Sequence, residues 1–137
     1  MGAMALRIAA VTLAGLCAAT VGAKVPLGQD QHINDSLVAA RVADTIRKAC
    51  PTISARTFVV LRKMSELKSY ARAQGYSEAE VKAFLKDGSE KARIRSKAQK
   101  ILAKAGARTG NAGSYCAAGR AEIAKGSLAG ALIRSEE

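Results

Sequence analysis

Apolar residues recur at intervals of three and four along most of the chain, the spacing that places them on one face of an α-helix. Val38, Val42 and Ile46 follow this spacing, and the polar residues 34–36 can cap the start of the helix. The pattern stops at residues 50–51, where a proline follows a cysteine, because proline cannot continue a helix. We therefore expect a first helix that ends at residue 49.

A longer apolar face follows the proline. Thr52 or Ser54 can cap this second helix, and Gly75 can end it. The residues on or beside its apolar face are Phe58, Val60, Leu61, Met64, Leu67 and Ala71.

Shorter helical patterns fill the rest of the chain. Ser77 and Glu80 have the spacing of a capping box, which predicts a short helix to about residue 86. Residues 87–89 can break and recap the chain before another apolar face that ends at Gly106. After a glycine-rich turn over 106–114, segments 115–125 and 128–134 indicate two short helical pieces.

No segment shows a convincing strand pattern, so the predicted fold class is all-α, a compact bundle of four to six helices. With 137 residues one domain is expected. Hydrophobic residues make up 49% and aromatic residues only 4%, with no Trp, so the core must come mainly from Ala, Leu, Ile and Val rather than from large rings. We place this helical domain at residues 33–137, after a flexible lead-in over residues 24–32 that mixes Pro, Gly and polar groups.

The first 23 residues resemble an export signal. Arg7 is their only charged residue and precedes an uncharged apolar run over 8–19, shorter than the roughly 20 residues that span a bilayer. Small residues at 21–23 suit a signal peptidase. We expect residues 1–23 to be a signal peptide cleaved after Ala23, which gives a periplasmic protein. The alternative is an uncleaved anchor in the inner membrane that faces the periplasm.

Cleavage would remove Cys17 and leave two cysteines, Cys50 and Cys116. In a small exported domain an even pair of cysteines indicates one disulfide. Closing a loop of roughly 67 residues would stabilise the fold by about 4 kcal/mol in the chain-entropy model. Redox or metal chemistry is the alternative, but there is no CxxC motif, and one His with two separated Cys is not a zinc site.

Charge is the strongest surface signal. The net charge is +11, and residues 82–108 hold nine basic side chains against two acidic ones. Four of these basic residues are four, three and four positions apart, so they form one stripe about a right angle from the apolar face of their helix. This basic stripe consists of Arg93, Lys97, Lys100 and Lys104.

The basic stripe is the candidate anion- or partner-binding site, because clustered positive charge attracts anions. An acidic protein or an anionic membrane surface is the expected partner. The alternative is a solvated helix face that only keeps the protein soluble. Nucleic acid is a poor candidate, because stacking aromatics do not alternate with the basic residues and export separates the protein from the genome.

Candidate catalytic chemistry is sparse. The only His, His32, lies in the lead-in without a partner that would make it a base. We expect no catalytic residue, no metal and no cofactor, and therefore a protein that is not an enzyme. Two alternatives stay open: a small periplasmic enzyme that would need a cleft with converging polar groups, and an envelope chaperone that would expose a large apolar patch.

Three blocks of the sequence resemble an uncharacterised family of short exported proteins from Rhodobacter-like alpha-proteobacteria. These blocks are residues 36–56, 70–87 and 114–135, with Cys50-Pro51 and Tyr115-Cys116 as recognisable points. The resemblance implies a Gram-negative periplasmic setting and no known activity. Genes of such proteins can lie among those of the respiratory NADH:quinone oxidoreductase, so the resemblance also implies an accessory protein of a membrane respiratory complex.

Overall fold

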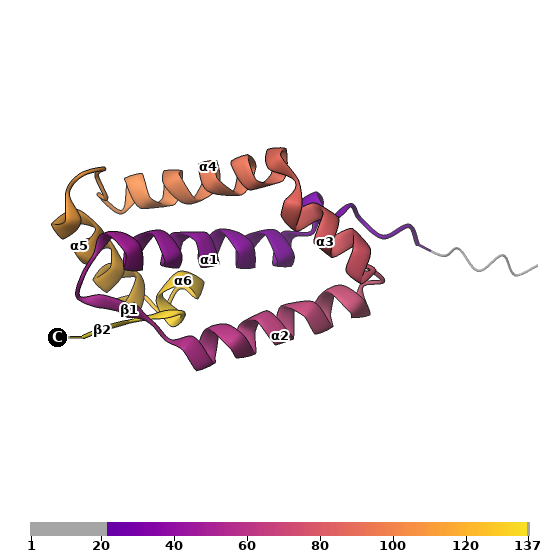
Figure 1. The fold of residues 1–137 in the computed structure, drawn as a ribbon, viewed down its shortest axis with the longest axis horizontal. Coiled ribbons are helices and arrows are strands. Elements are labelled where there is room, and N and C mark those ends of the chain that lie inside the picture. The colour runs from indigo at the N-terminus through magenta and orange to yellow at the C-terminus, as the bar shows by residue number, and fades with distance from the viewer. Residues whose placement is uncertain (1–21, 137) are drawn as a thin grey trace, which may run out of the picture.

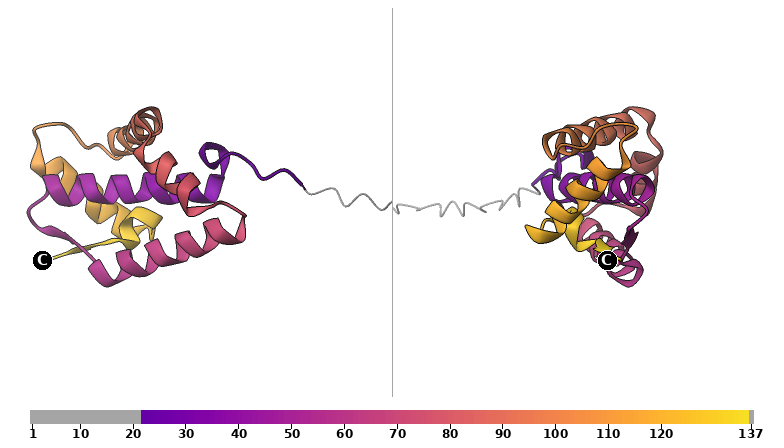
Figure 2. Two further views of the ribbon diagram at one scale, coloured as in Figure 1. Left: turned by 45° about the vertical axis from the view of Figure 1, so that its right-hand side comes forward. Right: turned by 90° about the vertical axis from the view of Figure 1, so that its left-hand side faces the viewer.

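The computed structural model describes residues 22–136 and contains six α-helices and a two-stranded sheet within that range. In every view α1 lies between α4 on one side and α2 on the other (Figure 1, Figure 2). The elements in chain order are a 3₁₀ turn η1 (Leu27–Gln29), α1 (Gln31–Ala49), β1 (Ile53–Ala55), α2 (Thr57–Ala73), α3 (Glu78–Lys86), α4 (Gly88–Lys104), α5 (Ala112–Ala124), α6 (Leu128–Ala131) and β2 (Ile133–Ser135). The predicted all-α fold class is confirmed.

The core forms around α1. Val42 and Ile46 are almost completely buried there, together with Ala98 of α4 and Ile133 of β2. These side chains are small or branched aliphatic groups, as a composition without Trp requires. Their burial is what holds the surrounding elements against α1, because removing apolar surface from water is the dominant favourable term in folding.

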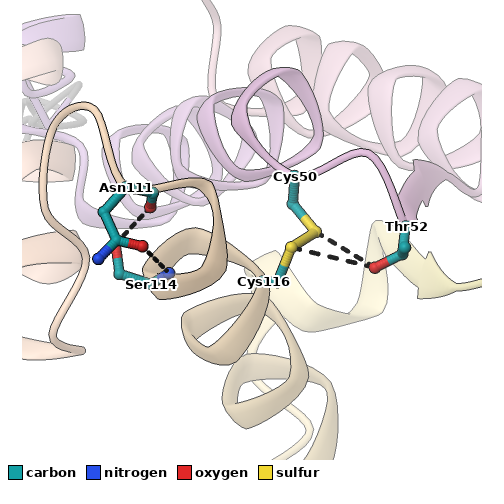
Figure 3. Close-up of a disulfide and its surroundings, with 5 residues drawn as sticks. All are labelled: Cys50, Thr52, Asn111, Ser114 and Cys116. Atoms are coloured by element: carbon teal, nitrogen blue, oxygen red, sulfur yellow. Dashed lines mark hydrogen bonds between the residues drawn. A yellow bond between two sulfur atoms is a disulfide. The ribbon is translucent and has the colours of Figure 1, made fainter.

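A disulfide joins Cys50 at the end of α1 to Cys116 in α5, with the two Cα atoms 5.1 Å apart (Figure 3). Both cysteines are buried, and the hydroxyl oxygen of Thr52 lies 3.4 Å from the sulfur of Cys50. Near the start of α5, Asn111 accepts a hydrogen bond from the backbone N–H of Ser114 at 3.0 Å and caps the helix. The predicted disulfide is confirmed, and it is compatible with an oxidising compartment.

The expectation that no strand forms is wrong. β1 and β2 pair antiparallel, with Ile53 opposite Ser135 and Ala55 opposite Ile133. Three residues are too few to show an alternating pattern, and β2 takes the end of the helix predicted over 128–134. Ser54, a candidate cap of the second helix, lies within β1, so α2 begins only at Thr57.

The first helix also begins earlier than the caps at 34–36 suggest. Asp30 is its N-cap: a carboxylate oxygen accepts the Ile33 backbone N–H at 3.0 Å, and the residue is only 6% exposed. Asn34 is buried within α1, where its amide donates to the carbonyl oxygens of Leu27 and Asp30. The boundary expected at residue 33 therefore moves into the segment expected to be a lead-in.

That segment contacts α3 and the turn before it. The ammonium group of Lys24 donates to a carboxylate oxygen of Glu80 at 2.7 Å and to the carbonyl oxygen of Gly75 at 3.0 Å. The hydroxyl of Tyr76 donates to the Val25 carbonyl oxygen at 2.5 Å. The predicted signal peptide, by contrast, falls on residues 1–23 and lies almost wholly outside the described residues.

We predict that Gly130→Ala lowers the free energy of unfolding by about 2 kcal/mol or more. A β-carbon at residue 130 would overlap the backbone carbonyl of Glu122, which cannot move aside as a side chain could. Urea unfolding of the purified protein measures the change. Gly88→Ala is the matched control, because its β-carbon would meet nothing within 4 Å. Equal stability of the two variants would contradict this close approach of α5 and α6.

We also predict a stability loss in acid that depends on Glu80. Hydrogen bonds from Lys24 and from the backbone N–H of Ser77 lower the pKa of Glu80 from 4.5 to about 2. Because the folded-state pKa is depressed, the stabilisation is complete above pH 4.5 and is lost as the pH falls toward 2. The stability difference between wild type and Glu80→Gln should therefore shrink over that window.

Unfolding midpoints measured at a series of pH values test this. Glu78→Gln is the control within the same helix turn, and it should keep the pH dependence of the wild type. If Glu80→Gln also kept that dependence in full, the contact of Lys24 with α3 would not contribute to stability.

Candidate functional site

Among the helices of residues 22–136, α4 carries the largest number of basic side chains without a carboxylate partner. Its 17 residues include six basic residues and one acidic residue, Glu90. Five of the six side chains are exposed, and no carboxylate of the described residues lies within 4.0 Å of them. These five are Lys91, Arg95, Lys97, Lys100 and Lys104.

The way α4 packs explains why these side chains point outward. Ala98 and Leu102 are buried against α1, and the contact between α1 and α4 is the most extensive between two helices of the domain. Lys97, Lys100 and Lys104 lie on the opposite side of α4 from this contact, toward solvent. The helix lies along one edge of the molecule (Figure 2). A partner could therefore approach the lysines without displacing any element.

Arg93 differs from the three lysines of the basic stripe. Its side chain is 31% exposed, and its guanidinium lies 2.6 Å from a carboxylate oxygen of Glu90. It also donates a hydrogen bond to the amide oxygen of Asn34, the buried residue at the start of α1. Arg93 thus connects α4 to α1, and the structure leaves Lys97, Lys100 and Lys104 as the accessible part of the stripe.

Carboxylates elsewhere are engaged with other groups. Although partial burial of Asp44 raises its pKa, hydrogen bonds from Lys48 and Arg47 outweigh that effect and hold the pKa below its ordinary value. Glu122 is buried and pairs with Lys125 at 2.6 Å. Asp87 caps α4 itself. Most acidic residues of the described chain are therefore engaged in caps or local ion pairs, and none lies within 4.0 Å of the five exposed cations of α4.

His32 lies in the first turn of α1, against the ring of Tyr70. The two ring centroids are 4.4 Å apart, and the Tyr70 hydroxyl donates to Asp30 at 3.3 Å. Desolvation, with the nearby charge of Asp30, raises the pKa of Tyr70. Because Asp30 also caps α1, this group supports the start of the helix. Within residues 22–136 no cluster of three His, Cys, Asp or Glu side chains could hold a metal.

Helix α2 exposes apolar side chains that the sequence placed on or beside its apolar face. Phe58 is 88% exposed, Leu61 58% and Met64 51%. The helix packs mainly through Leu67 and Ala71, near its C-terminal end, against the small cluster that contains Ile33 and Tyr76. Its N-terminal half therefore presents an apolar surface to solvent, which the periodicity alone did not predict.

These features define a small disulfide-linked helical protein with one strongly cationic helix. The chain belongs to the family of unknown function DUF5333, whose model matches residues 25–134. The expected resemblance to a family of unknown function is thereby confirmed. No curated protein and no solved structure matches the chain. Among the helices of residues 22–136, none has the length and apolar character needed to cross a membrane.

Proposed function

We propose that this protein is a non-enzymatic binding or accessory protein of the periplasm that engages an anionic surface through α4. The observation that carries the proposal is the set of exposed α4 cations without carboxylate partners. Like charges on one helix repel one another and produce a positive potential that attracts anions. An acidic protein surface or an anionic membrane would relieve that repulsion.

The distribution of charge favours a binding role over solubility alone. Mixed charges of both signs are enough to keep a small domain soluble, and α3 has such a surface, with two exposed Glu and two exposed Lys. Within residues 22–136, the one ion pair that α4 makes joins Glu90 to Arg93. Helix α4 thus concentrates five other cations on one element that presents them to solvent.

The proposed setting is the periplasm, after cleavage behind Ala23. The apolar run near the N-terminus and the disulfide between Cys50 and Cys116 both support export. The resemblance to short exported proteins supports a membrane respiratory complex as the partner that carries the anionic surface. In that case the α4 face would dock on an acidic region of the complex or on the lipid around it.

We predict that neutralising the lysines of α4 weakens binding to anionic vesicles by about 100-fold, because each Lys near such a surface contributes about 1 kcal/mol. The variant is Lys97→Gln/Lys100→Gln/Lys104→Gln. Co-sedimentation with phosphatidylglycerol vesicles measures the affinity, with phosphatidylcholine vesicles as the uncharged reference. Binding should weaken as salt is added.

The matched control is Lys48→Gln/Arg62→Gln/Lys63→Gln, which removes the same charge from exposed positions on α1 and α2. An equal loss in both variants would contradict a role for α4 specifically. Cross-linking in intact cells distinguishes the two kinds of partner. An acidic protein captured by wild type and lost in the α4 variant identifies a protein surface, whereas vesicle binding without such capture identifies the membrane.

A chaperone-like role in the envelope is the second candidate, and the apolar surface of α2 favours it. Phe58, Leu61 and Met64 lie within two turns of one helix and are each more than half exposed. Exposed apolar patches on monomeric proteins commonly mark interaction sites. Non-native chains, which expose apolar segments, are the class of partner that such a surface would shield.

If this role is real, Phe58→Ser/Leu61→Ser/Met64→Ser should lose about half or more of any ability to suppress aggregation, since exposed apolar area is what non-native chains contact. Light scattering of a heat-denatured test protein provides the measurement. Leu128→Ser, which removes an exposed apolar side chain outside α2, is the control. Absence of suppression by the wild-type protein would exclude the chaperone role.

A further inference from the structure

A pocket of about 320 Å³ lies between α1, α4 and the start of α5, and Lys97, Lys100 and Lys104 do not line it. Arg41 and Thr45 line it from α1, and Arg95 lines it from α4. Arg95 precedes Lys97 by two residues, about 200° around the helix, so the pocket and the lysines occupy different flanks of α4. Of the exposed α4 cations, Arg95 lines the pocket, whereas Lys97, Lys100 and Lys104 do not.

Arg41 is the unusual residue of this pocket. Its side chain is half-buried, and no carboxylate of the described residues lies within 4.0 Å of it. The acid nearest to it along α1, Asp44, binds Arg47 at 2.6 Å and Lys48 at 2.7 Å instead. A partly desolvated guanidinium without an anion is unfavourable, and the presence of Arg95 in the same pocket adds repulsion.

The rest of the lining is suited to an anion with an apolar body. No Asp or Glu lines the pocket itself, and Asp44, which lines the adjoining hollow, is paired with Arg47 and Lys48. Gln99, Thr109 and Tyr115 add neutral hydrogen-bond donors from α4, the 105–111 loop and α5. The hydroxyl of Thr45 donates to the Arg41 carbonyl oxygen and so offers only acceptor capacity. Beneath these polar groups lie the buried apolar side chains of α4, Ala98 and Leu102.

From this lining we infer that the Arg41–Arg95 pocket binds a phosphate monoester. Two guanidinium groups match a dianion in charge, and each can donate to phosphate oxygens in the paired geometry that arginine favours. Donors on three different elements surround the space, which suits the tetrahedral oxygens of a phosphate better than the planar oxygens of one carboxylate. The apolar floor accommodates the organic group of the ester.

The phosphate monoester could be a soluble metabolite or the head group of an anionic lipid, because the two share this chemistry. The site shares Arg95 with the exposed cations of α4 but also uses Arg41 of α1, whereas docking of α4 on a surface is tested on Lys97, Lys100 and Lys104. The two ideas can therefore fail separately.

Isothermal titration of the purified protein with phenyl phosphate tests the inference. Phenyl phosphate should bind, and inorganic phosphate, which lacks an apolar body, should bind more weakly. Arg41→Gln and Arg95→Gln should each weaken phenyl phosphate binding about tenfold or more, as expected for loss of a charge-assisted hydrogen bond. Benzoate, a monoanion with a similar body, should also bind about tenfold more weakly than phenyl phosphate.

The control is Lys97→Gln/Lys100→Gln/Lys104→Gln, which should bind phenyl phosphate as the wild type does. Vesicles that contain phosphatidic acid test the lipid source. If the protein binds these vesicles only when Arg41 and Arg95 are present, and does not bind phenyl phosphate, the ligand of the site is a lipid head group. Unfolding curves verify that each variant is folded, and Arg95, being exposed, provides a variant should Arg41→Gln fail to fold.

Three results would overturn the inference. The first is absence of binding to phenyl phosphate, inorganic phosphate and phosphatidic acid alike. The second is full retention of binding in both arginine variants. The third is benzoate binding as tightly as phenyl phosphate, which would remove the reason for assigning the pocket to a phosphate.

Discussion

Val42 and Ile46 of α1 are almost completely removed from water, and α4, α5, α6 and β1 each reach the core by contacting this helix. The chain has no Trp and few other aromatic residues, so close approach of small aliphatic side chains must supply the packing. The disulfide holds the end of α1 against α5 and so fixes the C-terminal elements on the same scaffold. Without the burial along α1, none of these elements would have a common surface to pack on.

This mode of packing also determines where charge can be placed. Helix α4 attaches through one face that contains Ala98 and Leu102, and the rest of its surface stays in water. Long basic side chains can occupy that surface at little cost, because their charged groups remain hydrated. The same contact between α1 and α4 leaves a pocket on one flank, in which Arg41 lies half-buried. The exposed lysines of α4 and the Arg41–Arg95 pocket are thus both consequences of how α4 packs against α1.

The candidate site was only partly predictable from the sequence. Spacing along α4 correctly placed Lys97, Lys100 and Lys104 on one exposed side, because helical geometry is local. The same spacing predicted that Arg93 belongs to this exposed stripe, but Arg93 instead donates a hydrogen bond to Asn34 of α1. Arg41 gave no sequence signal at all. Arg41 becomes a candidate ligand-binding residue only because Arg95, which is distant along the chain, lines the same pocket and because Asp44 is paired with other cations.

The sequence by itself determined the helical segments whose signals lie within a few residues. The capping box of Ser77 and Glu80, the stop at Pro51 and the single possible pairing of the two cysteines outside the N-terminal apolar run are of this kind. Only the tertiary structure decided that β1 pairs with β2, which lies about 80 residues further along the chain. It also decided that the N-terminal half of α2 leaves its apolar side chains exposed to solvent. The physical reason is that caps and periodicity act between neighbours, whereas strand pairing, burial and the surroundings of a charge depend on residues that only folding brings together.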